Sequence, residues 1–318
     1  MKLEGVFQKQ KIMRKLFISL IPILLMSTYF FGLRVIVLCL INILVAVLIE
    51  KLFLVKTKRK ISEAVFITAI LFTCTLPPNI PIWISIIGIS FGMIFGKMVF
   101  GGFGKNIFNP ALVGRAFIYV SFAGDMTQKW QNISDGFIGG FSKYLSKPID
   151  VLTMATPLTE FRNNGIENEL WNVFIGKIPG SIGETSALLI IIVGIYLIIS
   201  KTASKEIILS YLLCFLLFDW IMYLFNIEGV PSPVYGLLTG GVLFGIVFMA
   251  TDPISAPKEK VAKVIYGITI GILTVIIRTY ALFAGGVMFA ILIGNIFSPI
   301  FDLFAKWIKT QRIKVVSR

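Results

Sequence analysis

The sequence predicts an all-α polytopic membrane protein with about ten transmembrane helices. Of its 318 residues, 57% are hydrophobic and only 14% are charged. Soluble domains, by contrast, are about 45–50% apolar and about 25% charged. Apolar runs close to the roughly 20 residues that cross a bilayer recur along the whole chain. We predict spans at about residues 15–31, 33–54, 61–76, 80–99, 105–124, 185–200, 206–225, 233–250, 261–279 and 282–301.

These spans predict a single integral membrane domain over residues 1–318, because their short connections leave no room for a soluble domain. A first helix group covers 15–124, a second covers 185–301, and a basic tail follows at 302–318. Between the groups lies one long polar loop, 125–184, with seven acidic and five basic residues. Long loops among short connections are usually functional.

The net charge of +14 follows a pattern typical of membrane topology. With the amino terminus in the cytoplasm, 22 of the 30 Lys and Arg residues fall on the inner face. Cytoplasmic loops are enriched in these residues, which also favour the anionic lipids of that leaflet. We therefore predict cytoplasmic termini, an extracytoplasmic long loop and membrane lipids as partners. Nucleic acid is not expected as a partner.

Two short motifs occur twice, which predicts a weak inverted repeat. Thr75–Pro81 (TLPPNIP) resembles Thr251–Pro257 (TDPISAP), and Asn106–Pro110 (NIFNP) resembles Asn295–Pro299 (NIFSP). The third span is expected to run outward and the eighth inward, and repeats of opposite direction are common in membrane carriers. The alternative is a chance recurrence of Thr and Pro at helix ends.

Residues that usually bind metals are scarce. The chain has no histidine, and its three cysteines, Cys39, Cys74 and Cys214, are single residues within apolar spans. Histidine-ligated haem is excluded, and these cysteines support neither an iron–sulfur cluster, a zinc site nor a disulfide framework. We predict no metal site and no side-chain catalytic set.

A threonine motif in the long loop is the strongest functional signal. Asp150, Thr153, Ala155 and Thr156 lie in the stretch DVLTMAT, and Pro157 follows. Proline favours an extended residue before it, and the small Ala155 leaves the Thr156 hydroxyl accessible. The stretch resembles the Asp-x-x-Ser/Thr-x-Ala-Thr signature at which a flavin transferase esterifies the phosphate of FMN to the last threonine. The alternative is a threonine-rich surface turn.

A glycine-rich run, residues 95–115, precedes the loop and contains five glycines. Glycine permits close approach of a backbone or a planar ligand. Asn106 and Asn109 are placed near a helix start, where their amides suit the edge of an isoalloxazine or an ion. The alternative that stays open is close helix packing with an asparagine cap.

The glycine-rich run also carries a family resemblance. Its part 101–115 resembles the hallmark of the NqrB/RnfD membrane family, which comprises one subunit of the Rnf electron transport complex and one of the sodium-translocating NADH:quinone oxidoreductase. Four further blocks, at 150–158, 179–186, 249–257 and 286–302, match this family in order.

The resemblance implies a flavoprotein subunit of a complex in a bacterial or archaeal cell (inner) membrane. Such a complex moves electrons between ferredoxin or quinone and NAD, coupled to Na⁺ or H⁺ movement, and its other subunits carry flavins and iron–sulfur clusters. By resemblance, Thr156 carries covalent FMN, attached by a flavin transferase, and a second, non-covalent flavin such as riboflavin is an open question. About 14 residues precede the first span, which favours the RnfD type. The alternatives are the NqrB type, from the quinone reductase, and a redox-silent solute carrier or channel.

Asp219 is the carboxylate expected deepest in the bilayer, within the seventh span. A charge at that depth costs about 2.5–3.5 kcal/mol on insertion scales and normally faces a partner or a water-filled cavity. Asp219 is therefore a candidate for the ion pathway, or a structural partner of a residue such as Arg115 or Arg278. Asp252 and Asp302 are expected to make helix-end contacts.

Overall fold

The computed structural model describes five stretches of the chain, residues 7–55, 59–134, 136–144, 155–281 and 286–316. Within them it is almost entirely helical, with one short parallel strand pair, β1 (Phe7–Gln8) and β2 (Ile61–Ser62). Five of the described helices are long and apolar enough to cross a membrane, and four shorter ones are also apolar. The all-α polytopic membrane fold is therefore confirmed.

The first helix group follows the predicted spans closely. It consists of α1 (Lys11–Phe31), α2 (Arg34–Leu54), α3 (Ala64–Cys74), α4 (Ile82–Met93) with its π-helical continuation η3 (Ile94–Met98), and α5 (Pro110–Ser121). Local sequence sets several ends. Gly32, at φ 99°, ends α1, and prolines 77 and 78 follow α3 closely and prevent its continuation.

The second group begins after the long loop. It consists of α9 (Ala187–Ile199), α10 (Lys205–Leu224), α11 (Pro233–Leu238), α12 (Val242–Phe244) with its π-helical continuation η5 (Gly245–Met249), α13 (Lys260–Tyr280) and α14 (Gly286–Val316). The intervening loop holds α6 (Ala123–Gln128), the 3₁₀ turn η4 (Gly139–Ser142), α7 (Pro157–Asn164) and α8 (Leu170–Ile175).

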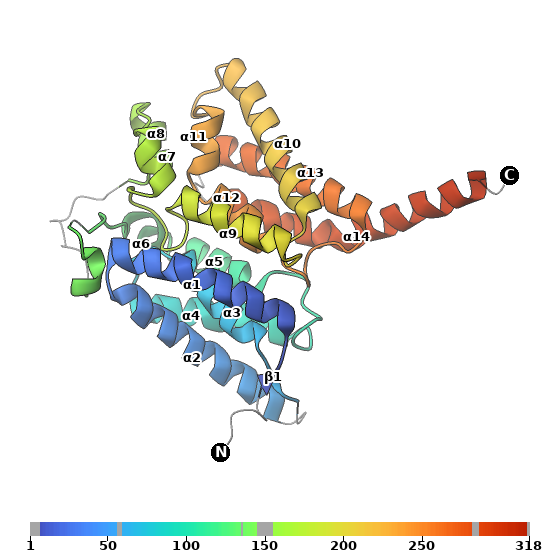
Figure 1. Ribbon diagram of the computed structural model, residues 1–318, viewed down its shortest axis with the longest axis horizontal. Helices are drawn as coiled ribbons and strands as arrows, with labels where there is room; N and C mark the ends of the chain where they lie inside the picture. The colour runs from blue at the N-terminus through green and yellow to red at the C-terminus, as the bar shows by residue number, and fades with distance from the viewer. Residues whose placement is uncertain (1–6, 56–58, 135, 145–154, 282–285, 317–318) are drawn as a thin grey trace.

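The two groups pack against each other, with α1 against α9 and α5 against α14. Figure 1 shows the first group in blue to green beside the second in yellow to red. Buried apolar side chains from both groups form one hydrophobic cluster. The loop helices α6, α7 and α8 lie at the side of the molecule away from the end of α14 (Figure 1).

Three predicted boundaries were wrong. The predicted span 233–250 is not one helix but breaks between α11 and α12, where Gly240 and Gly241 have φ of 60° and 71°. Helix α5 begins at Pro110 rather than 105, because Asn109 caps it and the preceding glycines take positive φ. The expected tail from residue 302 instead continues α14 to Val316, since helix-forming Ala, Lys, Gln and Arg residues follow Asp302 without a break.

A buried ion pair links α2 to the π-helical end of the fourth span. Lys97 Nζ lies 2.7 Å from Glu50 Oε2, and both side chains are 2% exposed. The other Glu50 oxygen accepts the backbone N–H of Ser62 at 3.1 Å. Buried charges require such paired and hydrogen-bonded surroundings. This pair therefore fixes the β2 segment and η3 against α2.

A second ion pair fastens the start of α1 to the residue ahead of α3. Glu63 accepts hydrogen bonds from the Gln10 backbone N–H at 2.6 Å and from Arg14 Nη2 at 2.6 Å. The hydrogen bond from Arg14 is the largest of the effects that lower the pKa of Glu63 below its ordinary value. A carboxylate with a lowered pKa stabilises the fold above its ordinary pKa, and this contribution disappears as the pH falls through the lowered value.

We therefore expect the Glu63→Gln variant to unfold at a lower temperature than the wild type at pH 7. The difference between their thermal midpoints should shrink as the pH is lowered below the ordinary glutamate value of about 4.3, because wild-type Glu63 then becomes protonated as well. Thermal unfolding of both proteins across pH 3–7 measures this difference. A difference that is independent of pH would show that the carboxylate charge does not contribute.

Candidate functional site

Thr156 is the N-cap residue of α7, directly ahead of Pro157. Its backbone is extended, at φ −69° and ψ 157°, as a residue before proline prefers. Its Oγ1 lies 2.9 Å from Thr159 Oγ1 and accepts a weaker bond from the Thr159 N–H at 3.4 Å. Ala155 and Thr156 are both half-buried, whereas Asp150 and Thr153 lie outside the described residues. The sequence motif thus places a threonine hydroxyl at a helix start.

An open pocket lies beside Thr156. It contains about 680 Å³ of space free of protein atoms, including its solvent-open mouth. Its wall combines aromatic, glycine and hydroxyl residues with one acidic and one basic side chain; among these are Tyr119, Trp130, Gly180, Ser181, Thr185, Thr239, Gly240 and Gly241. Ligand pockets are typically concave and apolar with a few well-placed polar groups. This composition suits a planar, partly polar ligand attached at the rim.

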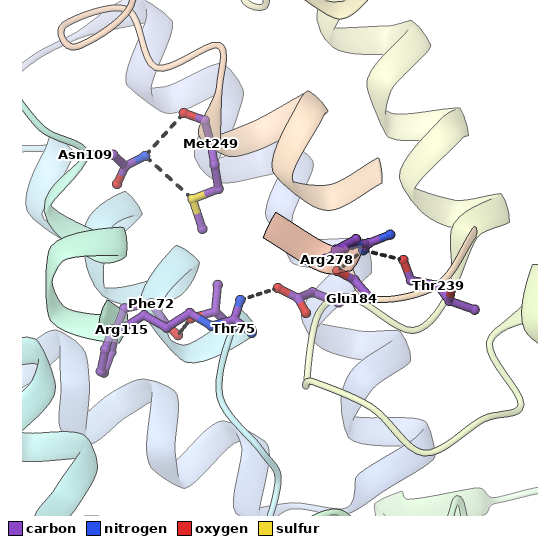
Figure 2. A network of polar contacts seen from close by, with 9 residues as sticks. Phe72, Thr75, Asn109, Arg115, Glu184, Thr239, Met249 and Arg278 are labelled. Carbon is purple, nitrogen blue, oxygen red and sulfur yellow. Dashed lines mark hydrogen bonds and ion pairs between the residues drawn. The ribbon is translucent and has the colours of Figure 1, made fainter. Parts of the chain in front are cut away.

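Arg115 and Glu184 provide the charges of the pocket wall. Arg115 Nη1 lies 2.7 Å from Glu184 Oε1, and their side chains are 11% and 9% exposed. Figure 2 shows Arg115, from α5, pointing toward Glu184, which lies in the segment ahead of α9. The buried Arg115 Nε has no hydrogen-bond partner. Since buried donors are normally satisfied, this wall residue retains a donor for a ligand, which fits the implied FMN.

The broken eighth span forms another side of the pocket. Arg278 of α13 donates to the carbonyl oxygens of Gly236, Thr239 and Gly240, at 2.8, 3.0 and 2.7 Å. Figure 2 shows its contact with Thr239. Non-helical backbone at membrane depth is tolerated where protein groups satisfy it, and Arg278 does so here. Leu238 to Gly241 consequently line the pocket beside Thr156.

Asn106 and Asn109 lie in a different cavity from Thr156. Both are buried, and they line a cavity of about 450 Å³, including its mouth, together with Lys97 and Asp252. Asn109 Oδ1 accepts the N–H of Ala111 at 3.1 Å, so Asn109 caps α5. Its amide nitrogen contacts Met249, as Figure 2 shows, and Asn106 Nδ2 donates to Phe108 O at 3.0 Å. These bonds agree with the helix-cap alternative for both asparagines.

The two echoed Asn-Ile-Phe motifs meet in space. The Asn109 backbone N–H donates to Asn295 Oδ1 at 3.2 Å, and Asn295 Nδ2 donates to Tyr266 OH at 2.9 Å. Asn109 precedes a helix, whereas Asn295 lies inside α14. The second motif therefore serves as a buried partner for the first rather than as a second helix start.

Asp219 lies on α10 and is 5% exposed, and its Oδ2 has no hydrogen-bond partner. A methyl group added at Gly236 would meet this oxygen at 2.9 Å, so the carboxylate sits against α11. Arg115 is not its partner, because Arg115 pairs with Glu184 instead. Arg278 interacts electrostatically with Asp219, although its donors are bonded to carbonyl groups.

Asp252 and Asp302 make the local contacts expected of them. Asp252 Oδ2 accepts from Ser255 Oγ at 2.7 Å. Asp302 accepts the backbone N–H groups of Lys258 and Glu259, at 3.0 and 2.9 Å, ahead of α13. Sequence reasoning missed Glu184, Trp130 and Thr239 as neighbours of Thr156. The block 179–186 and the echo ahead of α13 were the available signals, but no spacing rule places them together.

Comparison with known proteins gives the family. Residues 4–310 match the NQR2, RnfD, RnfE family. The chain belongs to this family. The match covers both helix groups and the loop between them, including Thr156.

Named relatives are all the B component of one enzyme, the Na⁺-translocating NADH-quinone reductase. The chain is 39% identical over 271 residues to this component from Pseudomonas paraeruginosa, a match of 80% of this chain and 62% of that protein. Its counterpart from Ectopseudomonas mendocina is 40% identical over 268 residues and that from Yersinia pestis 37% over 272, with the same coverage. The chain thus spans about three fifths of the length of these relatives. Their names favour the quinone-reductase alternative over the RnfD-type assignment expected from the sequence.

Proposed function

We propose that this chain is the flavin-carrying membrane subunit of an ion-translocating oxidoreductase complex, with FMN esterified to Thr156. The observation that carries this proposal is the half-buried Thr156 hydroxyl at the rim of the open pocket, within a flavin-transferase motif. The family assignment supports a redox role. A redox-silent carrier would need neither the motif nor the adjoining pocket.

The residues around Thr156 have distinct parts in this proposal. Thr156 offers the acceptor hydroxyl, and its bond with Thr159 must open for a flavin transferase to reach it. Trp130 and Tyr119 supply aromatic surface for a planar ring, and Arg115 supplies a positive charge and a free donor. The Arg115–Glu184 pair closes the inner end of the pocket, because both residues also line the next cavity inward. FMN, when bound, supplies one-electron and two-electron redox chemistry.

We propose that the complex is of the NADH–quinone reductase type, because the named relatives are components of that enzyme. The ferredoxin–NAD complex of the Rnf type is the second candidate, which the shared family leaves open. Electrons would enter and leave through flavin and iron–sulfur groups of other subunits. The transported ion would be Na⁺ or H⁺.

The membrane topology is also part of the proposal. We place both termini in the cytoplasm and the loop 125–184 on the outer side of a bacterial or archaeal cell (inner) membrane. The distribution of Lys and Arg supports this orientation. A flavin transferase would then act on Thr156 from the outer side.

Mass spectrometry of the protein purified from its native cells tests the cofactor directly. Trypsin is expected to release residues 144–162, which contain Thr153, Thr156 and Thr159. Fragmentation should assign the mass of an esterified FMN to Thr156 and to neither of the other threonines. An unmodified peptide from cells that make the flavin transferase would refute the covalent flavin.

Asp219 is proposed as part of the ion pathway, because its buried carboxylate lacks a hydrogen bond at one oxygen. In the reconstituted complex, Asp219→Asn is expected to reduce ion movement about tenfold or more while NADH oxidation continues. The reason is that the substitution preserves the side-chain shape and removes the charge that would attract a cation. Ion flux and NADH oxidation measured on the same vesicles separate the two effects, and unchanged flux per NADH would exclude this role.

A second, non-covalent flavin such as riboflavin stays a proposal. Its candidate place is the cavity beside Asn106 and Asn109. The amide groups of both asparagines already bond protein atoms, so a ligand there would have to displace those bonds. Flavin released by denaturation from a Thr156→Val protein would reveal it.

A further inference from the structure

A large basic groove lies on the opposite side of the second helix group from α11, where α9 ends and α10 and α13 begin. The groove contains about 1560 Å³ of space free of protein atoms, including the part open to solvent. Its wall comes from both halves of the chain, since Ile12 of α1 lies across from residues 198–207 and 251–263. It shares no lining residue with the pocket beside Thr156.

Positive charge dominates this groove. Five lysines and one glutamate line it, and the lysines are Lys201, Lys205, Lys258, Lys260 and Lys263. In the described part of the chain, none of the five forms an ion pair. The glutamate, Glu206, accepts a hydrogen bond from Ser204 Oγ at 2.9 Å. Like charges gathered without counterions repel each other, so an anion in the groove would stabilise it.

The neighbouring acidic groups do not neutralise the lysines. Asp302 is occupied by the backbone N–H groups of Lys258 and Glu259, at 2.9–3.1 Å. Asp252 is bonded to Ser255. Asp302 thereby fixes the backbone at Lys258 and leaves that lysine's side chain exposed toward the groove.

The groove also has an apolar side. Ile199 is 75% exposed and Ile12 is 49% exposed, next to the partly buried Ile198. The groove collects the ends of four apolar helices, α1, α9, α10 and α13, which begin or end within a few residues of it. Helix ends of membrane spans lie at the level of the phospholipid headgroups. Lysines therefore adjoin exposed apolar side chains at the depth where phosphate meets acyl chain.

We propose that this groove is a binding site for the phosphate headgroup of an anionic phospholipid. The lysines bind the phosphate, and the acyl chains lie over Ile12 and Ile199. Basic pockets between membrane helices are a recognised form of site for anionic headgroups. The assignment does not depend on the flavin or on the ion that the complex moves.

The test uses the complete 318-residue chain, purified in an uncharged detergent, with phosphatidylglycerol or phosphatidylcholine of matched acyl chains as probes. Native mass spectrometry measures retained lipid, and thermal unfolding measures stabilisation. Phosphatidylglycerol should be retained in preference and raise the unfolding midpoint. The triple variant Lys258→Gln/Lys260→Gln/Lys263→Gln should bind it about a hundredfold more weakly, from about fivefold for each lysine.

The matched control is Lys51→Gln/Lys306→Gln/Lys309→Gln, which removes the same charge from exposed positions outside the groove. It should keep wild-type affinity. Equal losses in both triple variants would mean that overall charge, and not this groove, attracts the lipid, and unchanged retention in the groove variant would overturn the site outright. Inorganic phosphate that stabilises the protein as well as phosphatidylglycerol does would assign the groove to a free anion instead. No lipid preference, with loss of an acidic partner protein from the groove variant, would assign it to a protein contact.

Discussion

A Thr156→Val protein, made in cells that contain the flavin transferase, is expected to carry no covalent flavin. Valine matches threonine in shape but has no hydroxyl, so no phosphate ester can form. The wild-type protein should give a yellow-green fluorescent band after denaturing electrophoresis, and the variant band should be dark. Because the flavin would carry the electrons through this protein, NADH-dependent quinone reduction by the complex should fall to background.

Two neighbouring substitutions make this result specific. Thr159→Val removes the hydroxyl that lies 2.9 Å from that of Thr156, yet leaves the acceptor in place, so its band should still fluoresce. Thr156→Ser keeps a hydroxyl and should retain at least part of the signal. A fluorescent Thr156→Val band would move the attachment to another residue, and a dark wild-type band would favour the redox-silent carrier.

The helical spans could be predicted well because hydrophobicity and length act locally. Helix α2, for example, has a mean hydropathy of 2.6 and is bounded by Arg34 and Lys51 near its ends. The break between α11 and α12 could not be predicted from the same signal. Its residues are apolar enough for a continuous span, and the break depends on Arg278, about 40 residues later, satisfying the freed carbonyl groups.

The candidate site shows the same division. Thr156 was predictable because its motif is contiguous, and the structure adds that it caps α7 beside a pocket. The Arg115–Glu184 pair joins residues 69 positions apart, so no local pattern links them. Sequence alone suggested Arg115 as a partner for Asp219, since both are charges expected in the bilayer. Only the packing of α5 against the segment ahead of α9 decides between the two carboxylates.

Replacing Lys97 with methionine is expected to cause the largest loss of stability among these substitutions. Methionine has nearly the length of the lysine stem and fills the space, but it leaves the Glu50 carboxylate buried without its cation. Breaking a buried ion pair in this way costs about 3–5 kcal/mol. The thermal unfolding midpoint in detergent and the yield of folded protein should both fall sharply.

The double variant Glu50→Gln/Lys97→Met should recover most of that loss, because it removes the orphaned charge as well as the cation. Glutamine can still accept the Ser62 N–H, which Glu50 accepts at 3.1 Å. The matched control is Arg14→Met, which breaks the ion pair with Glu63 where the arginine is 51% exposed, and exposed pairs contribute only about 0–1 kcal/mol. If Lys97→Met changed the stability by no more than about 0.5 kcal/mol, as surface substitutions do, the pair would have to be hydrated. A strong single effect with recovery in the double variant would instead locate the energy in the charge pair itself, which holds α2, β2 and η3 together.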